Sequence, residues 1–275
     1  MTLGLLKTFE QCKNDGRTAL MPFLTSGYPT KGIFVELMQT VSSSGADMIE
    51  VGIPFSDPMA DGETIQKTSQ AALNNGVNID STFDSLLKLK SFTTPIILMS
   101  YYNPIYHYGV ARFLKTASQL GVKGLIIPDM IPEEGIEIEC MTKKQGIDLI
   151  YLLAPTSNID RINLITNRSR GFVYLVSVAG VTGVRSKLPA YIPNWIRRIR
   201  ALSKLPVCVG FGISNHRQAS AIGQYADGVI VGSALADTII KAPTRLQKIK
   251  CASEFIISLR ASLDNVNKAG KNHRR

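Results

Sequence analysis

The sequence lacks the features that mark several classes of protein. No run of about 18 consecutive apolar residues occurs, so we expect no membrane-spanning helix. The segment Met1–Lys7 has neither the apolar stretch nor the small-residue cleavage site of a signal peptide, and no long Arg- and Ser-rich leader follows. We therefore expect the protein to stay in the compartment where it is made.

Cysteine and histidine are scarce in this chain of 275 residues. The four cysteines, at positions 12, 140, 208 and 251, lie far apart without a Cys-x-x-Cys pair, which favours a reducing compartment and argues against zinc. The three histidines show no metal-ligand spacing, and no Gly-x-Ser-x-Gly motif accompanies them. The sequence thus predicts neither a metal site nor a serine hydrolase.

Acidic residues are absent from Arg161 to Ala226, whereas ten Lys or Arg occur there. The other 21 cations balance the 21 acids, so this stretch accounts for the whole formal net charge of +10. Two interpretations stay open: a positive field that attracts an anionic substrate, or the solvated outer faces of helices. Nucleic-acid binding is less favoured, because aromatic residues do not interleave with the cations.

Short apolar runs alternate with helical patterns from end to end. Eight such runs, each typical of a buried parallel strand, occur at residues 20–24, 48–53, 96–102, 125–128, 149–154, 172–178, 207–211 and 229–231. Eight strand–helix units predict an α/β fold, a single-domain (β/α)8 TIM barrel over residues 1–264. We expect an extra N-terminal helix around Leu5–Cys12 on the barrel floor, another helix around Phe83–Leu89, and a basic, disordered tail at 265–275.

The second strand carries a carboxylate. Alternation places Met48, Glu50 and Gly52 on one face and the branched residues Ile49, Val51 and Ile53 on the other. If the branched set packs against helices, Glu50 points into the barrel mouth, where burial would raise its pKa towards neutrality, as an acid–base catalyst requires. The alternative is a buried Glu paired with a cation or with backbone donors.

Two further carboxylates stand near strand ends, where barrel enzymes place their chemistry. Asp61 closes the long loop after the second strand and is a candidate catalytic group, although it could instead cap the helix that begins at Glu63. Asp129 ends the fourth strand and is predicted to support or gate the site rather than to react.

The last three strand ends are rich in glycine. They read Gly180-Val181-Thr182-Gly183, Gly210-Phe211-Gly212-Ile213-Ser214 and Gly232-Ser233. Glycine lets backbone N–H groups approach an anion, and we expect Ser214 and Ser233 each to open a helix. Because the loops after strands seven and eight form the recurring phosphate site of these barrels, the pattern predicts a phosphate-binding end, the alternative being plain turns.

These residues give the chain a close resemblance to the α subunit of tryptophan synthase. The resemblance covers about residues 5–260 and rests on strings at residues 20–29, 49–62, 102–104, 128–129, 180–183 and 210–214. Of these, the second string, from Ile49 to Gly62, is the most specific. The chain departs from the family at Val178-Ala179, where many relatives have an Arg or a Thr, and at Glu63, where relatives commonly have Pro.

The resemblance implies retro-aldol cleavage of indole-3-glycerol phosphate to indole and glyceraldehyde 3-phosphate, without a cofactor in this chain. It implies Glu50 as the proton shuttle and Asp61 as the carboxylate that accepts the indole N–H. Phe23, Ile65, Tyr102, Tyr174 and Phe211 would wall the indole, and Gly183, Gly212, Gly232 and Ser233 would hold the phosphate. The 55–61 and 180–188 loops would close together, with Thr182 steadying Asp61.

The family also implies a partner, a β subunit that carries pyridoxal phosphate and receives indole within an α2β2 heterotetramer. Met59, Tyr106 and Tyr108 suit such a contact surface, the alternative being local loop packing. No nucleic-acid or membrane partner is predicted. The expected location is a bacterial cytoplasm, or a plastid stroma if the protein is organelle-encoded. The sequence does not separate the two, and its Lys-, Asn- and Ile-rich composition is no more than a hint of the second.

Two rival classes stay open. Another phosphate-binding barrel would be an indole-glycerol-phosphate synthase, with a Lys on an inner strand, or a ribosyl-phosphate isomerase, with Asp on strands one and five. The runs Leu20–Leu24 and Leu149–Ala154 contain neither. The second rival is a non-catalytic basic barrel that binds RNA or a protein.

Overall fold

A computed structural model of the chain describes residues 4–89, 91–176, 191–210 and 212–272, with side chains as far as residue 265. All eight predicted apolar runs form parallel strands, and the fifth run is divided into two short strands by Tyr151. The strands are β1 (Ala19–Thr25), β2 (Ile49–Gly52), β3 (Ile96–Met99), β4 (Gly124–Ile126), β5 (Asp148–Ile150), β6 (Leu152–Leu153), β7 (Val173–Val176), β8 (Val207–Gly210) and β9 (Gly228–Val231).

The strand order shows that the sheet closes on itself. Neighbouring strands follow the order β5-β4-β3-β2-β1-β9-β8-β7-β6, so β5 and β6 form the two edges. Only Tyr151 separates these two strands along the chain, and β5 pairs with β4 while β6 pairs with β7. Both edges therefore belong to one run of residues, and the predicted (β/α)8 barrel is confirmed.

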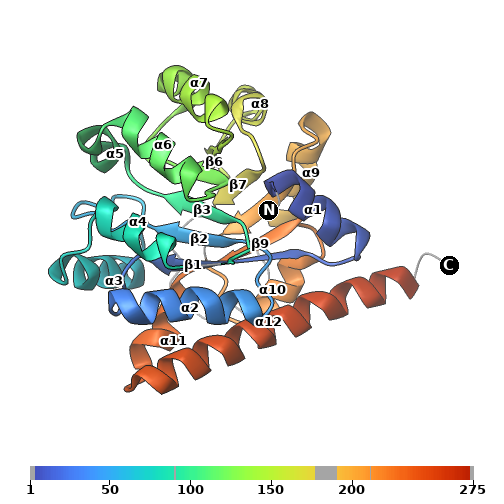
Figure 1. Cartoon of the computed structure of the whole chain (residues 1–275). Helices are drawn as coiled ribbons and strands as arrows, with labels where there is room; N and C mark the ends of the chain where they lie inside the picture. Colours follow the sequence, from blue (N-terminus) through green and yellow to red (C-terminus); the bar gives the residue numbers. More distant parts are fainter. Residues whose placement is uncertain (1–3, 90, 177–190, 211, 273–275) are drawn as a thin grey trace.

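Helices surround the barrel (Figure 1). They are α1 (Leu5–Asn14), α2 (Lys31–Ser43), α3 (Glu63–Asn74), α4 (Ile79–Leu87), α5 (Tyr102–Tyr108), α6 (Val110–Gln119), α7 (Ile136–Lys144), α8 (Ile159–Arg168), α9 (Tyr191–Leu202), α10 (His216–Gly223), α11 (Ser233–Lys241) and α12 (Arg245–Asn272), with a 3-10 turn, η1, at Pro132–Glu134. The long helix α12 packs against α2, α10 and α11. It continues past residue 264, where the sequence predicted the domain to end.

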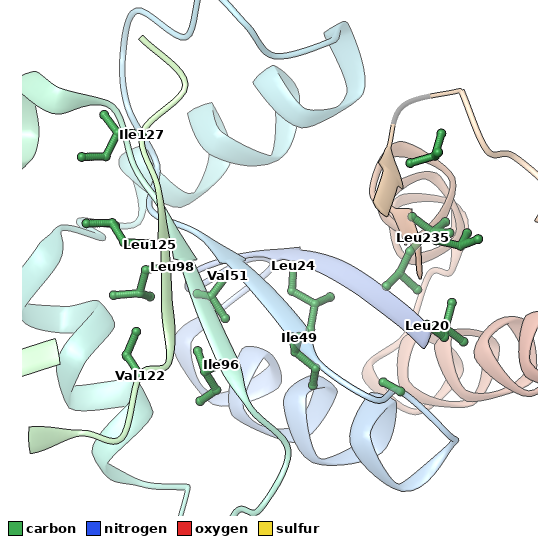
Figure 2. Close-up of a cluster of buried hydrophobic side chains, with 14 of the residues drawn as sticks. Leu20, Leu24, Ile49, Val51, Ile96, Leu98, Val122, Leu125, Ile127 and Leu235 are labelled. Carbon is green, nitrogen blue, oxygen red and sulfur yellow. The ribbon is translucent and has the colours of Figure 1, made fainter. Parts of the chain in front are cut away.

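Side-chain alternation along the strands produces two apolar layers. Outward-facing residues such as Leu24, Val51 and Leu98 pack against the helices (Figure 2). Inward-facing residues such as Met21, Met48 and Ile97 fill the barrel, and Leu5, Phe9 and Cys12 of α1 belong to the same inner cluster. The extra N-terminal helix thus packs against the barrel interior, as predicted.

Candidate active site

Glu50 lies on the inner face of β2, opposite Phe23 of β1 and Ile97 of β3. Gly52 follows on the same face and leaves room for the Phe23 ring, since a Cβ there would lie 2.3 Å from Phe23 Cζ. The branched residues Ile49 and Val51 pack outward against the helices, as the alternation predicts. The strand therefore aims one carboxylate into the barrel.

The Glu50 side chain is fully buried, and neither carboxyl oxygen has a hydrogen-bond partner among the described residues. Burial first, and the charge of Asp61 second, raise the pKa of Glu50 to about 8. Among the described residues, Glu50 therefore has neither the cation nor the backbone donors of the alternative that the sequence left open. At neutral pH Glu50 carries a proton that it can deliver to a bound molecule.

Asp61 lies at the end of the loop between β2 and α3. The residue that caps α3 is Gly62, and no side-chain capping bond is present, so the alternative role of Asp61 as the helix cap is wrong. Burial raises the pKa of Asp61 to about 6, and a hydrogen bond from the Tyr101 hydroxyl partly opposes this increase. Asp61 is thus the more acidic of the two carboxyl groups. Glu63 is accommodated as the first residue of α3.

A cavity of about 380 Å³ contains both carboxyl groups. Its apolar wall consists of Phe23, Ile65, Met99, Tyr174 and Ile230. Gly212, Gly232 and Ser233 also line it, and Ser233 is the first residue of α11. The start of a helix presents free N–H groups and a positive dipole end, which suit an anion. The cavity can therefore hold a molecule with a flat apolar part and an anionic part.

Other predicted site residues lie elsewhere or outside the described part of the chain. Tyr102 begins α5; its ring lies 5.9 Å from that of Tyr106, and its N–H donates to the Asp129 carboxylate at 2.9 Å. Phe211, Thr182, Gly183 and Val178-Ala179 fall outside the described residues.

Ser214 does not open a helix, contrary to the sequence prediction. Asn215 caps α10 instead, and its side chain accepts the Gln218 N–H. The Ser214 N–H and hydroxyl both donate to Gln218 Oε1, at 2.7 and 2.9 Å. Ser233, in contrast, does begin its helix, with Gly232 before it as the cap.

Sequence reasoning missed Tyr101. This side chain is only 3% exposed, and its hydroxyl accepts the Ala60 N–H at 2.9 Å. The signal was present in the alternation of the third strand, because Ile97 and Met99 face the barrel interior and the next inward position is 101 rather than 102.

A comparison with known families decides which barrel this is. The model of the family described as tryptophan synthase alpha chain matches residues 9–265. The chain belongs to this family. Members of the tryptophan synthase alpha chain family cleave indole-3-glycerol phosphate to indole and glyceraldehyde 3-phosphate, and this lyase activity is that of the present chain. The rival phosphate-binding and RNA-binding barrels are thereby excluded as its family.

Individual relatives agree with this family. The tryptophan synthase alpha chain of Dehalococcoides mccartyi is 44% identical over 250 residues, which cover 90% of this chain and 96% of that protein. A Mycobacterium tuberculosis tryptophan synthase structure superposes with a TM-score of 0.88 at 36% identity and covers 96% of this chain and 99% of that one. Tryptophan synthase subunit alpha from Legionella pneumophila gives 0.87 at 37% identity, with 95% and 98% covered.

The stretch without acids contributes several ion pairs with acids outside it. Arg161 pairs with Glu133, Arg168 with Glu139 at 2.7 Å, and Arg200 with Asp227 at 2.9 Å. The charges of these three arginines are therefore partly neutralised. For them this favours the interpretation as solvated outer helix faces over a positive field that attracts an anionic substrate. Arg185 and Lys187 lie outside the described residues.

The described residues contain neither a membrane-spanning helix nor a cluster of metal ligands. None of the helices there is long and apolar enough to cross a membrane. No group of three or more His, Cys, Asp or Glu side chains within the same residues is arranged so that it could hold a metal ion.

Proposed function

We propose that Glu50 and Asp61 together carry out the cleavage of indole-3-glycerol phosphate in this chain. The observation that supports this proposal is one cavity that contains two carboxyl groups with different pKa values. One is buried, has no hydrogen-bond partner within the described part of the chain and has a pKa of about 8, and the other has a pKa of about 6. Two carboxyl groups with separated pKa values can act as acid and anion at the same pH.

In the proposed reaction Glu50 transfers its proton to C3 of the indole ring. The ring becomes a cationic imine, and Asp61 stabilises it by accepting the ring N–H. The Glu50 carboxylate then takes the proton of the adjacent side-chain hydroxyl. The carbon–carbon bond breaks as that oxygen forms the aldehyde. The electron pair of the broken bond returns to the cationic ring and makes it neutral indole. Indole and glyceraldehyde 3-phosphate leave, and Glu50 is protonated again.

The two ends of the cavity fit the two ends of this substrate. In this proposal Phe23, Ile65 and Tyr174, which line the cavity, enclose the indole ring, and the backbone at Gly212, Gly232 and Ser233 binds the phosphate. Roles for Tyr102 and Phe211 at the ring, Gly183 at the phosphate and Thr182 beside Asp61 stay predictions. The proposed reaction consists of proton transfers and electron-pair shifts within the substrate, so we propose no cofactor in this chain.

We further propose a β subunit as partner, in an α2β2 assembly in which that subunit carries the pyridoxal phosphate. Met59 and Tyr106 are 84% and 63% exposed near the mouth of the barrel, which suits a protein contact. Tyr108 is less suitable, because its hydroxyl donates to Asp80 at 2.8 Å and its ring packs on Phe113. Of the two compartments left open, we favour the bacterial cytoplasm, since the relatives compared are bacterial.

Indole release from indole-3-glycerol phosphate by the purified chain, with and without a matched β subunit, tests this proposal. We expect slow release by the chain alone and much faster release with the β subunit. Folded protein that binds glycerol phosphate but releases no indole in either case would contradict the proposed reaction. Equal rates with and without the β subunit would contradict the proposed partnership alone.

A further inference from the structure

We propose that Tyr101 is a positioning residue that holds the Asp61 carboxylate and both ends of the 55–61 loop in the arrangement that the reaction needs. This inference rests on the function proposed above, and it gives a task to a side chain that the reaction itself does not use. Tyr101 immediately precedes α5 and is buried between the loop and the barrel.

The Tyr101 side chain contacts the loop at both of its ends. Its ring centroid lies 5.3 Å from that of Phe55, the first residue of the loop, with the planes tilted by 33°. Its hydroxyl oxygen accepts the backbone N–H of Ala60, near the other end, at 2.9 Å. One rigid side chain therefore fixes where the loop leaves the barrel and where it returns.

Asp61 and Tyr101 line one small cavity, and the Tyr101 hydroxyl lowers the pKa of the Asp61 carboxyl group. Burial first, and the Asp61 charge second, raise the pKa of Tyr101, so the phenol keeps the proton that it donates. A hydroxyl that accepts from Ala60 and donates to Asp61 has its only hydrogen committed to the carboxylate. Because the Tyr101 oxygen accepts the Ala60 N–H, its own hydrogen is available to the Asp61 carboxylate.

The remaining hydrogen bonds of the loop are local among the described residues. The Asp61 N–H donates to Pro58 O at 3.3 Å, and Gln66 of α3 donates to the Asp61 carbonyl oxygen at 2.8 Å. The Ser56 hydroxyl donates to its neighbour Asp57. None of these bonds connects the loop to the barrel strands. Beyond Asp61, helix α3 is held to β1 by the Thr25–Thr68 hydrogen bond at 2.6 Å, and before Asp61 the loop is held at the end of β3 by Tyr101.

The surroundings connect this contact to the substrate cavity. Asp61 and Tyr101 line a small cavity of about 10 Å³ together with Phe23 and Met99, which also line the main cavity. The charge of Asp61 interacts with Glu50, Tyr101 and Tyr174, and Asp129 acts on Tyr101 as well. Cys208 acts in addition on Tyr174. A carboxylate that stabilises charge must be correctly placed before the charge appears, because small displacements weaken electrostatic catalysis.

Replacing Tyr101 by Phe tests the proposal, because it removes the hydroxyl and keeps the ring on Phe55. In the complex with a matched β subunit, we expect Tyr101→Phe to lower kcat for indole release by about 10- to 100-fold, the scale of losing one hydrogen bond to a charged group. The KM should change by less than about threefold, since phosphate and ring contacts remain. The acidic limb of the pH profile should move to higher pH, because the lost bond had lowered the pKa of Asp61.

Tyr151→Phe is the matched control. The Tyr151 side chain is 2% exposed, and its hydroxyl also donates to a carboxylate, Glu139, at 2.6 Å, on the outer side of the barrel. This variant should keep the wild-type kcat and pH profile. Glycerol phosphate binding by Tyr101→Phe should also equal that of the wild type, which shows that the variant is folded.

The double variant separates positioning from a purely structural role. In the Asp61→Asn background, Tyr101→Phe should change the remaining rate by less than about threefold, because Tyr101 acts through the Asp61 carboxylate. If the wild type releases indole and Tyr101→Phe has the same kcat and pH profile, this inference is overturned and the proposed function stays intact. If Tyr101→Phe lowers kcat as much in the Asp61→Asn background as in the wild type, the inference is also overturned. No indole release by the wild type would instead contradict the proposed function.

Discussion

At the scale of single residues, burial separates the properties of the two carboxyl groups. Glu50 is fully buried without a hydrogen-bond partner among the described residues, whereas Asp61 receives the Tyr101 hydroxyl. A buried carboxylate without donors costs several kcal/mol, so the fold tolerates Glu50 mainly in its protonated form. Stability is thus exchanged for reactivity at this position.

This cost makes the stability of the protein depend on pH through Glu50. The pKa of Glu50 is 4.5 in the unfolded chain, its ordinary value, and about 8 in the folded protein. Between these two pH values the folded state therefore holds a proton that the unfolded state has lost. The contribution of Glu50 is therefore greatest below the lower value and is lost as the pH rises through the higher one. Glu50→Gln removes this titration and preserves the shape of the protonated side chain.

We accordingly predict that Glu50→Gln has nearly wild-type stability at about pH 5 and is more stable than the wild type by about 2–5 kcal/mol at about pH 9. Urea unfolding at both pH values measures the difference. Lys250→Met, which changes an exposed side chain on α12, should show no such pH-dependent gain. A constant difference between Glu50→Gln and the wild type across this range would contradict the pKa assigned to Glu50.

The sequence was sufficient to place Glu50 but not its neighbours. Alternation on β2 determines which way Glu50 points, because the branched residues on either side pack against helices. The same alternation on β3 predicts that Tyr101 points inward, whereas the resemblance to the family implies Tyr102 as the residue beside the indole. The capping of α3 by Gly62 rather than Asp61 depends on how the loop folds back, which no local pattern reveals.

At the scale of elements, a cluster of ion pairs joins the last helix to the beginning of the barrel. Asp47, which precedes β2 and is 5% exposed in its side chain, pairs with Arg17 and, at 2.9 Å, with Arg260 of α12. Arg260 also donates to the Thr18 carbonyl oxygen at 3.0 Å and pairs with Asp264 at 2.7 Å. This cluster lies at the amino-terminal ends of β1 and β2, away from the catalytic carboxyl groups.

We predict that Arg260→Met destabilises the protein by about 2–4 kcal/mol, because it leaves the buried Asp47 with one cation instead of two and the Thr18 carbonyl without its donor. Chemical denaturation measures this loss. Lys250→Met, whose ion pair with Glu254 is exposed at 3.8 Å, should leave the unfolding midpoint unchanged. If Arg260→Met and Lys250→Met lower the free energy of unfolding equally, burial does not make the Arg260 ion pairs more stabilising than an exposed pair. The kcat for indole release should not change in either variant.

The sequence predicted which elements exist better than where they end. All eight apolar runs contain strands because each is buried on both faces, which the near-continuous hydrophobic pattern reports directly. The pattern did not show the division at Tyr151, since Tyr is a residue that strands favour and the break reflects pairing with β4 on one side and β7 on the other. Nor did it show how far α12 extends, because its last residues, 265–272, are polar and contribute no apolar period.

At the scale of the whole molecule, exposed apolar side chains near the barrel mouth mark the surface proposed to meet the β subunit. Met59 belongs to the same loop that carries Asp61, so binding at Met59 can act on the carboxylate through the short 59–61 segment. Met59 does not belong to the apolar core of this chain, since its side chain is 84% exposed. A partner that covers it would bury this apolar surface and order the loop.

We predict that Met59→Asp weakens binding of a matched β subunit by at least about tenfold, because it places a charge within an apolar contact. Leu246→Asp is the control, since Leu246 is 78% exposed at the start of α12, on another part of the surface. Titration calorimetry with the β subunit measures both affinities. Unchanged affinity of Met59→Asp would remove this loop from the proposed interface, and both variants should unfold at the wild-type midpoint.

Cleavage is proposed to depend on Glu50 and Asp61, and the turnover number for indole release tests this dependence most directly. We predict that Glu50→Gln and Asp61→Asn each lower kcat by at least about 100-fold while glycerol phosphate binds as tightly as to the wild type, because the chemistry is lost and the phosphate end is untouched. Near-normal turnover by either variant would contradict the account and remove that carboxyl group from the mechanism.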